Sequence, residues 1–201
     1  MKSMGAAAVL LTSGIAQADF SGNIGWASDY YFRGIFQAKS SASGGLDFES
    51  NGFYAGTWAA DVSDGLEVDG YFGYAKELGG IDLGIGFTGY YYTGNFDDTY
   101  QELNFSSGYG PATLDVAFGQ YKNFDGPTQD YAYYALTLEK NGFFGRLAGF
   151  GQDFSGEYLE LGYNFTVSEI DLGFKALFSD KDLTGESNEA LVFTIGKTFD
   201  F

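Results

Sequence analysis

The chain has 201 residues, enough for one ordinary domain, and a formal net charge of -17. This acidity argues against a nucleic-acid-binding surface, which needs a basic face. Without histidine or cysteine, the chain cannot form a Ser-His-Asp triad, a thiolate nucleophile or a disulfide framework. The 31 glycines, two prolines and 19% aromatic residues are typical of many strands joined by tight turns, not of a disordered acidic chain.

The first residues have the pattern of a secretory signal peptide. Lys2 supplies the positive start, Gly5 to Ile15 form a short apolar run, and Ala16-Gln17-Ala18 is a small-x-small cleavage pattern. We therefore expect a signal peptide at residues 1–18 and a single domain at residues 19–201. Beyond Ala18 no apolar run reaches the about 20 residues of a spanning helix. The mature chain is thus predicted to be either soluble and exported, or embedded as a barrel.

Period-two alternation of apolar and polar residues predicts strands along the mature chain. In residues 158–167, Leu159, Leu161 and Tyr163 share one face, whereas Glu160 and Gly162 share the other. The pattern predicts about twelve strands, an even number as in single-chain bacterial barrels. We expect them near residues 20–31, 41–50, 53–62, 66–78, 81–93, 98–109, 112–123, 130–140, 143–154, 156–167, 170–179 and 188–201.

Tight and long connections alternate between these strands. The tight ones are Asn51-Gly52, Gly79-Gly80, Gly110-Pro111, Asn141-Gly142 and Ser168-Glu169. The longer, more polar ones are RGIFQAKS, VSDGLE, TGNFDD, NFDGPTQD, DFSGE and SDKDLTGES. Short connections at one end and long ones at the other are typical of an all-β, transmembrane up-and-down antiparallel β-barrel. A soluble β-sandwich also alternates, but the signal peptide and the turn order favour the barrel.

The last strand carries apolar residues to its final carboxylate. Leu191, Phe193, Ile195, Phe199 and Phe201 are predicted to share the lipid face, and Lys197 breaks the pattern near the interface. The stretch also resembles the C-terminal signal that the barrel-assembly machinery recognises. The residues that match this assembly signal are Thr194, Gly196, Phe199 and Phe201.

The polar phase of the strands predicts an acidic lumen. The acids expected to line it are Asp47, Glu67, Asp69, Asp82, Glu102, Asp115, Glu139, Glu160 and Asp171. Only two basic residues, Arg146 and Lys175, are expected to oppose them. A water-filled lumen of this kind predicts an outer-membrane channel for passive diffusion of small solutes, mildly selective for cations. The alternative is a hydrogen-bonded plug, which would make the protein a closed structural or surface-interaction barrel acting through its outer loops.

Aromatic residues near the loop ends of the predicted strands are expected to form an interfacial girdle. They are Tyr30, Tyr31, Tyr91, Tyr92 and Tyr121. A sugar-stacking track would instead need lumen-facing rings, for which Tyr71, Tyr131 and Tyr133 are the candidates.

Two motifs resemble a dinucleotide site and a calcium loop, but neither meets the requirements of such a site. The Gly-x-Gly-x-x-Gly pattern at residues 84–89 continues a strand alternation, whereas a dinucleotide site needs a helix to begin there. The calcium-loop-like start at Asp180 lacks the required Glu, since Leu191 occupies the twelfth position. We expect no catalytic residues, no metal and no cofactor, and therefore no enzyme.

Residues 28–40, SDYYFRGIFQAKS, resemble a hallmark of the TorF family of proposed outer-membrane porins. The matching residues are Ser28, Asp29, Tyr30, Phe32, Arg33 and Gly34, whereas Phe36 departs from the small polar residue common there. The resemblance implies a barrel in the bacterial outer membrane, reached through the periplasm. We expect lipid, lipopolysaccharide, the barrel-assembly machinery and small solutes or ions as partners, and no nucleic acid.

Arg33 is a candidate loop anchor. Gly34 beside it permits an inward bend, so its guanidinium could pair with the acidic wall and hold the first long loop. The alternative is an exposed arginine at the end of a strand, at the level of the lipid headgroups.

Overall fold

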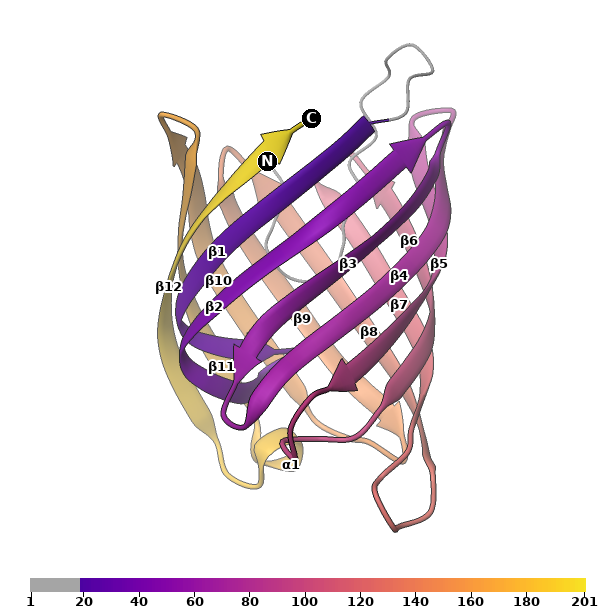
Figure 1. The fold of residues 1–201 in the computed structure, drawn as a ribbon, viewed down its shortest axis with the longest axis vertical. Coiled ribbons are helices and arrows are strands. Elements are labelled where there is room, and N and C mark those ends of the chain that lie inside the picture. Colours follow the sequence, from indigo (N-terminus) through magenta and orange to yellow (C-terminus); the bar gives the residue numbers. More distant parts are fainter. Residues whose placement is uncertain (1–18) are drawn as a thin grey trace.

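The computed structural model describes residues 19–201, so the predicted signal peptide lies outside the described residues. These residues form an antiparallel barrel of tilted strands (Figure 1). The elements are β1 (Asp19–Phe32), β2 (Ile35–Ser50), β3 (Phe53–Val62), β4 (Gly65–Leu78), β5 (Ile81–Tyr92), β6 (Tyr100–Tyr109), β7 (Ala112–Tyr121), β8 (Gln129–Lys140), β9 (Phe143–Gln152), β10 (Glu157–Val167), β11 (Ile170–Ser179), α1 (Lys181–Thr184) and β12 (Asn188–Asp200).

The barrel is closed by its first and last strands. Each strand pairs with its neighbours in the chain, and β1 pairs with β12 from Ser21↔Asp200 to Ala27↔Thr194. The backbone N–H of Phe201 adds a hydrogen bond to the carbonyl of Phe20 at 3.0 Å. The prediction of a twelve-stranded antiparallel barrel is confirmed. Within residues 19–201, no helix has the length and apolar character needed to cross a membrane.

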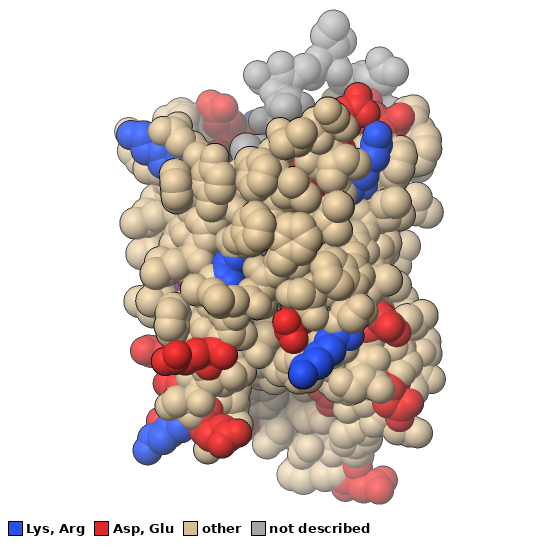
Figure 2. All heavy atoms as spheres, turned by 90° about the vertical axis from the view of Figure 1, so that its left-hand side faces the viewer, with Lys and Arg blue, Asp and Glu red and all other residues tan. Residues whose placement is uncertain are grey.

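Alternation along the strands separates two faces of the wall. Large apolar side chains such as Leu46, Phe72 and Leu103 point outward and are exposed. Figure 2 shows charged side chains gathered toward the two ends of one side, with a mostly uncharged belt between them. The glycines and polar side chains of the same strands point inward. An exposed apolar face of this extent needs a nonpolar environment.

All five predicted tight turns lie at one end of the barrel, together with both ends of the described chain (the turn end, at the top of Figure 1). Every residue of these turns except Pro111 has a positive φ angle, as two-residue hairpins favour. Asn51 and Gly52, for example, have φ angles of 52° and 86°. The sequence therefore located these turns correctly.

The connections at the other end (the loop end) are not uniformly long, which corrects the sequence prediction. The first is a two-residue turn of Arg33 and Gly34, with φ angles of 49° and 84°. The second, Ser63 and Asp64, also has two residues. The remaining connections span residues 93–99, 122–128, 153–156 and 180–187. The strand predicted at 41–50 begins six residues earlier, because the polar stretch after Gly34 pairs with β1 and is not a loop.

The hairpin at this first connection leaves the wall. Pairing of β1 with β12 stops at Ala27, and pairing of β2 with β3 begins at Ser43. Ladder pairing of residues 28–42 (the inner hairpin) is therefore confined to the β1–β2 pair in the described chain. In Figure 1 the loop ends of β1 and β2 turn from the wall into the interior. A register shift between Tyr30 and Tyr31 and a φ of 56° at Ser40 accompany this departure.

Candidate functional site in the barrel lumen

The nine acids that the sequence assigned to the lumen all lie on the inward phase of their strands, but the structure divides them into two groups. Four are buried in the half of the lumen near the loop end, where the inner hairpin lies: Glu67, Asp69, Glu102 and Glu160. Five lie toward the turn end and are partly or fully accessible: Asp47, Asp82, Asp115, Glu139 and Asp171. The acidic lumen is therefore two environments, which the alternation alone did not separate.

Arg33, at the tip of the inner hairpin, crosses the lumen to Glu102 of β6. Its Nη1 and Nη2 donate to Glu102 Oε2 and Oε1 at 2.8 and 2.7 Å. This bidentate pair is the strongest geometry available to a guanidinium and a carboxylate. Both partners are buried, with side-chain exposures of 7% and 0%, so water does not screen the pair.

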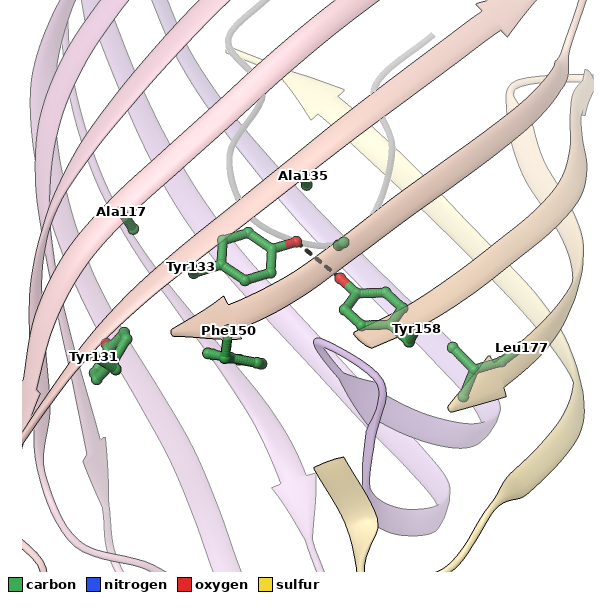
Figure 3. Close-up of a cluster of buried hydrophobic side chains, with 8 residues drawn as sticks. Ala117, Tyr131, Tyr133, Ala135, Phe150, Tyr158 and Leu177 are labelled. Carbon is green, nitrogen blue, oxygen red and sulfur yellow. Dashed lines mark hydrogen bonds between the residues drawn. The ribbon is translucent and has the colours of Figure 1, made fainter. Parts of the chain in front are cut away.

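Aromatic rings complete the surroundings of this ion pair. The Arg33 guanidinium carbon lies 3.9 Å from the centre of the Tyr133 ring, a cation–π distance. The hydroxyl of Tyr90 donates to Glu102 Oε1 at 2.7 Å, and that of Tyr131 donates to Oε2 at 2.9 Å. Figure 3 shows Tyr131 and Tyr133 projecting into the interior. The carboxylate is thus fixed in place by wall residues as well as by Arg33.

Glu67 and Asp69 of β4 lie beside this centre. Glu67 accepts hydrogen bonds from the hydroxyls of Tyr30, at 2.6 Å, and Tyr92, at 3.0 Å. Asp69 lies within electrostatic range of Glu67, Glu102 and Arg33. Within residues 19–201, its Oδ1 is buried and has no hydrogen-bond partner. Three acidic side chains therefore lie within electrostatic range of one guanidinium.

A second ion network lies across β9, β10 and β11. Lys175 donates to Glu160 at 2.5 Å, and Arg146 lies 3.6 Å from the other oxygen of Glu160. Arg146 also donates from Nε to Thr137 at 3.0 Å. Both basic residues that the sequence placed in the lumen thus meet at the same acid. In the part of the chain described, no group of three or more potential ligands is placed to hold a metal ion.

The half of the lumen near the turn end is lined mainly by small residues. On β5 and β6 these are Gly84, Gly86 and Ser106, where a Cβ on Gly84 would lie 2.4 Å from the Ser106 hydroxyl oxygen. Asp47 accepts from the Tyr71 hydroxyl at 2.5 Å, yet remains partly accessible. Tyr54 occupies part of the space beside these small residues, since a Cβ on Gly86 would lie 2.3 Å from its hydroxyl oxygen.

Several tyrosines have a role that the sequence prediction missed. Tyr30 and Tyr92 were expected in an interfacial girdle, as was Tyr121, whose hydroxyl donates to Asp97 at 2.8 Å. All three instead satisfy carboxylates, because a buried or partly buried acid needs hydrogen-bond donors. The alternation of the strands could have identified these tyrosines as inward-facing. Tyr92 is an even number of residues from the inward Asp82, whereas the exposed Tyr91 is not.

The candidate assembly signal divides between the two faces of β12. Thr194 and Gly196 have the inward phase, whereas Phe199 and Phe201 point outward and are exposed. Lys197 also lies on the outer face, where it pairs with Glu169 at 2.9 Å.

The fold and the polar, inward-facing network define the class: a closed antiparallel barrel of the outer-membrane type with a partly occluded lumen. The chain belongs to the Gcw_chp family, a family of bacterial proteins of unknown function whose profile matches residues 12–198. A comparison with curated proteins finds no match.

Solved structures share the fold at low sequence identity. A membrane protein from a study of in-meso crystallization is 11% identical, with a TM-score of 0.59 over 91% of this chain and 84% of that chain. The COG4313 outer membrane channel from Pseudomonas putida F1 is 12% identical, with a TM-score of 0.51 over 94% of this chain and 97% of that chain.

Proposed function

We propose that the protein is an outer-membrane channel for passive diffusion of small solutes, with a mild preference for cations, and that the structure is its closed conformation. A channel function is supported by the Pseudomonas putida barrel of similar fold, which is an outer membrane channel. The exposed apolar face outside and the polar face inside are what a transmembrane barrel with an aqueous lumen requires.

The observation that carries the proposal is the way in which the lumen is closed. The wall strands leave accessible acids and small residues in the turn-end half, whereas the inner hairpin fills the loop-end half. A permanent plug would gain from pairing with the wall, yet residues 28–42 have no ladder to β3 or β12. Side-chain contacts replace it, such as Ser179 Oγ donating to the Gly34 carbonyl at 2.7 Å. Each such neutral bond contributes only about 0.5–1.5 kcal/mol, so release of the hairpin depends mainly on breaking the buried Arg33–Glu102 pair.

The preference for cations follows from the accessible acids. Asp82 and Asp171 face the lumen near its turn end, whereas the basic residues described in the lumen are engaged elsewhere: Arg33 by Glu102, and Arg146 and Lys175 by Glu160. A lumen with this balance has a negative potential, which attracts cations and repels anions.

A closed barrel that works through its loops is the second candidate. It is favoured by the complete burial of Glu67 and Glu102, because a dense buried network also suits a static scaffold. In that case the segments at 93–99, 122–128 and 180–187 would be the functional part.

Export, location and assembly belong to the same proposal. We propose that residues 1–18 direct export through the periplasm and that Thr194, Gly196, Phe199 and Phe201 are read by the barrel-assembly machinery. Lipopolysaccharide and lipid would then contact the outer face. Membership of the TorF family remains a prediction from residues 28–40.

Single-channel recording tests the channel against the closed scaffold. The mature chain and Arg33→Ala are refolded in detergent, checked by heat-modifiable migration and inserted in a planar bilayer under a potassium chloride gradient. We expect rare openings from the wild type, frequent openings from Arg33→Ala, and a reversal potential on the cation side. A folded Arg33→Ala barrel that stays silent would favour the scaffold.

Lys197→Ala is the matched control. It also removes one positive charge and one ion pair, but its side chain lies on the outer face with Glu169. We expect it to conduct like the wild type. An equal rise in openings for both variants would show that loss of charge, not release of the inner hairpin, changes the current.

A further inference from the structure

The Arg33 side chain occupies a preformed cation site whose shape suits a guanidinium group. We propose that this site, made by Glu102, Tyr133, Tyr90 and Tyr131, binds small organic cations carrying a guanidinium group, and that such a ligand competes with Arg33 and releases the inner hairpin. The effect of such a ligand on conductance rests on the proposed channel function. Binding of the ligand to the site can be measured without any conductance.

The site is built by the wall and not by the hairpin. Glu102 is on β6, Tyr90 on β5, and Tyr131 and Tyr133 on β8. Two tyrosine hydroxyls and the side-chain amide of Asn104 donate to Glu102, the amide at 2.6 Å. These contacts hold the carboxylate in its orientation whether or not Arg33 is present. The receptor is therefore preorganised, which lowers the cost of binding a free ligand.

The chemistry of the site discriminates between cations. Glu102 receives two parallel N–H bonds from Arg33, and Tyr133 presents its ring face at 3.9 Å. A planar guanidinium satisfies both contacts at once, whereas an ammonium is a point charge without the fork or the flat face. The site thus selects guanidinium compounds over amines of equal charge.

Asp69 lies beside the site. Its Oδ1 is buried without a hydrogen-bond partner in the described residues, and the side chain lies within electrostatic range of Arg33 and Glu102. An unpartnered acceptor next to the site favours a ligand that brings additional N–H donors.

The Arg33 side chain can be exchanged for a ligand because it is attached to the inner hairpin and not to the wall. Arg33 sits at the tip of residues 28–42, which lack backbone pairing with the neighbouring wall strands. A tethered group of this kind acts as an intramolecular competitor with an effective concentration on the order of millimolar. Removing it should uncover the site for ligands in solution.

Chemical complementation tests the proposal. Ethylguanidinium reproduces the atoms that Arg33→Ala removes beyond Cβ, and n-propylammonium is an amine of equal charge and similar length. Binding of each to detergent-refolded wild type, Arg33→Ala and Arg33→Ala/Glu102→Gln is measured by titration calorimetry. We expect Arg33→Ala to bind ethylguanidinium at least about tenfold more tightly than the wild type. The double variant should lose this gain, and n-propylammonium should bind Arg33→Ala at least about tenfold more weakly.

Arg146→Ala is the matched control, since it removes the other lumen arginine and leaves Arg33 on Glu102. It should bind ethylguanidinium no better than the wild type. Equal binding by wild type and Arg33→Ala, or equal affinity for the two cations, would overturn the proposal. If Arg33→Ala does not refold, Arg33→Gln replaces it in the same titrations. Failure of both to form a heat-modifiable barrel would also overturn it, because an exchangeable occupant is not required for folding.

Recording separates this inference from the channel proposal. In bilayers, ethylguanidinium should raise the frequency of openings of the wild type, and it should leave the already frequent openings of Arg33→Ala little changed because the free ligand is not tethered to the inner hairpin. If ethylguanidinium binds but neither chain conducts, the channel proposal is wrong and the proposed binding site stands. If the chains conduct but ethylguanidinium does not bind, the proposed binding site is wrong and the channel proposal stands.

Discussion

The two halves of the lumen use the same inward-facing acids in different surroundings. Near the loop end, Glu67 and Glu102 are buried and take hydrogen bonds from tyrosines and Arg33. Near the turn end, Asp82 is exposed and Asp171 is partly accessible among small residues. A carboxylate buried in the first setting depends on its partners, whereas one in the second is solvated. The same residue type is thus a buried structural group in one half and an accessible one in the other.

The difference arises from one hairpin. Were residues 28–42 to continue in the wall, β1 and β2 would pair with β12 and β3 along their whole length. By leaving the wall they bring Arg33 to Glu102, and Tyr30 to Glu67. The buried half is therefore produced by residues far apart in sequence, and the accessible half by neighbouring strands alone.

Glu102→Gln should give the largest effect on stability. It removes the charge that opposes Arg33 in a site where both groups are buried, a change that costs about 3–5 kcal/mol. Asp82→Asn alters an exposed acid and should stay within about 0.5 kcal/mol of the wild type. Urea unfolding equilibria in lipid vesicles measure both. Equal losses would mean that the two halves do not differ in the way described.

Gly34→Ala should expel the hairpin at a smaller cost. Gly34 and Gly80 both have a φ of 84° in two-residue turns, so alanine strains each backbone by about 1–2 kcal/mol. A Cβ on Gly34 would lie 2.7 Å from the Tyr158 ring and 2.9 Å from Leu183, whereas Gly80 has open space. Overpacking should add about 1–3 kcal/mol to the loss for Gly34→Ala.

Conductance distinguishes these two glycine variants further. Gly34→Ala should raise the frequency of openings, since the clash lies between the hairpin tip and the wall. Gly80→Ala should not change it. The same frequency in both variants would argue against a hinged hairpin.

Local signals explain how much was predictable from the sequence. Alternation identified the strands, and Asn-Gly and Gly-Gly pairs located the turns, because both depend on a few neighbouring residues. The path of residues 28–42 could not be read in this way: the segment alternates poorly, and its polar residues look like a loop. What places it in the lumen is a set of contacts between residues far apart in the sequence, such as Arg33 and Glu102, whose numbers differ by 69.

The same limit applies to the candidate site. Phase placed Glu102 and Glu160 on the inner face, but their burial depends on which strands lie opposite, and single-sequence patterns carry no such information. Arg33 was singled out with its bend at Gly34, whereas its partner was not named. Tyr131 was noticed as a ring and not as a donor, since only the fold brings its hydroxyl to a carboxylate.

Selectivity should depend on the accessible half. In the open Arg33→Ala background, Asp82→Asn/Asp171→Asn should reduce the cation preference several-fold at low salt, because both acids lie in water along the path. At about 1 M salt the Debye length falls to about 3 Å, so the difference should nearly vanish. Reversal potentials at two ionic strengths measure this. An undiminished preference in the variant at low salt would assign the field to Glu67 and Asp69 instead.

The smallest expected effect is the change in stability with pH that comes from one acid at each end of the barrel. The backbone N–H of Thr99 lowers the pKa of Asp98, helped by that of Phe124, so this carboxylate bridges two loops at the loop end. At the turn end, the hydrogen bond from Lys197 lowers the pKa of Glu169. Since both pKa values are depressed on folding, each contribution is present above the unfolded pKa and is lost as pH falls through the folded one.

Salt should affect the lowered pKa values of Asp98 and Glu169 differently. Mobile ions screen an exposed lysine and glutamate, whereas short hydrogen bonds from backbone N–H groups are much less sensitive to them. Carboxyl ¹³C NMR of labelled barrels should therefore show the pKa of Glu169 rising toward its usual range in high salt while that of Asp98 stays low. A parallel rise of both would mean that charge attraction, and not the backbone donors, holds Asp98. In that case the bridge between the loops at 93–99 and 122–128 would weaken as ionic strength rises.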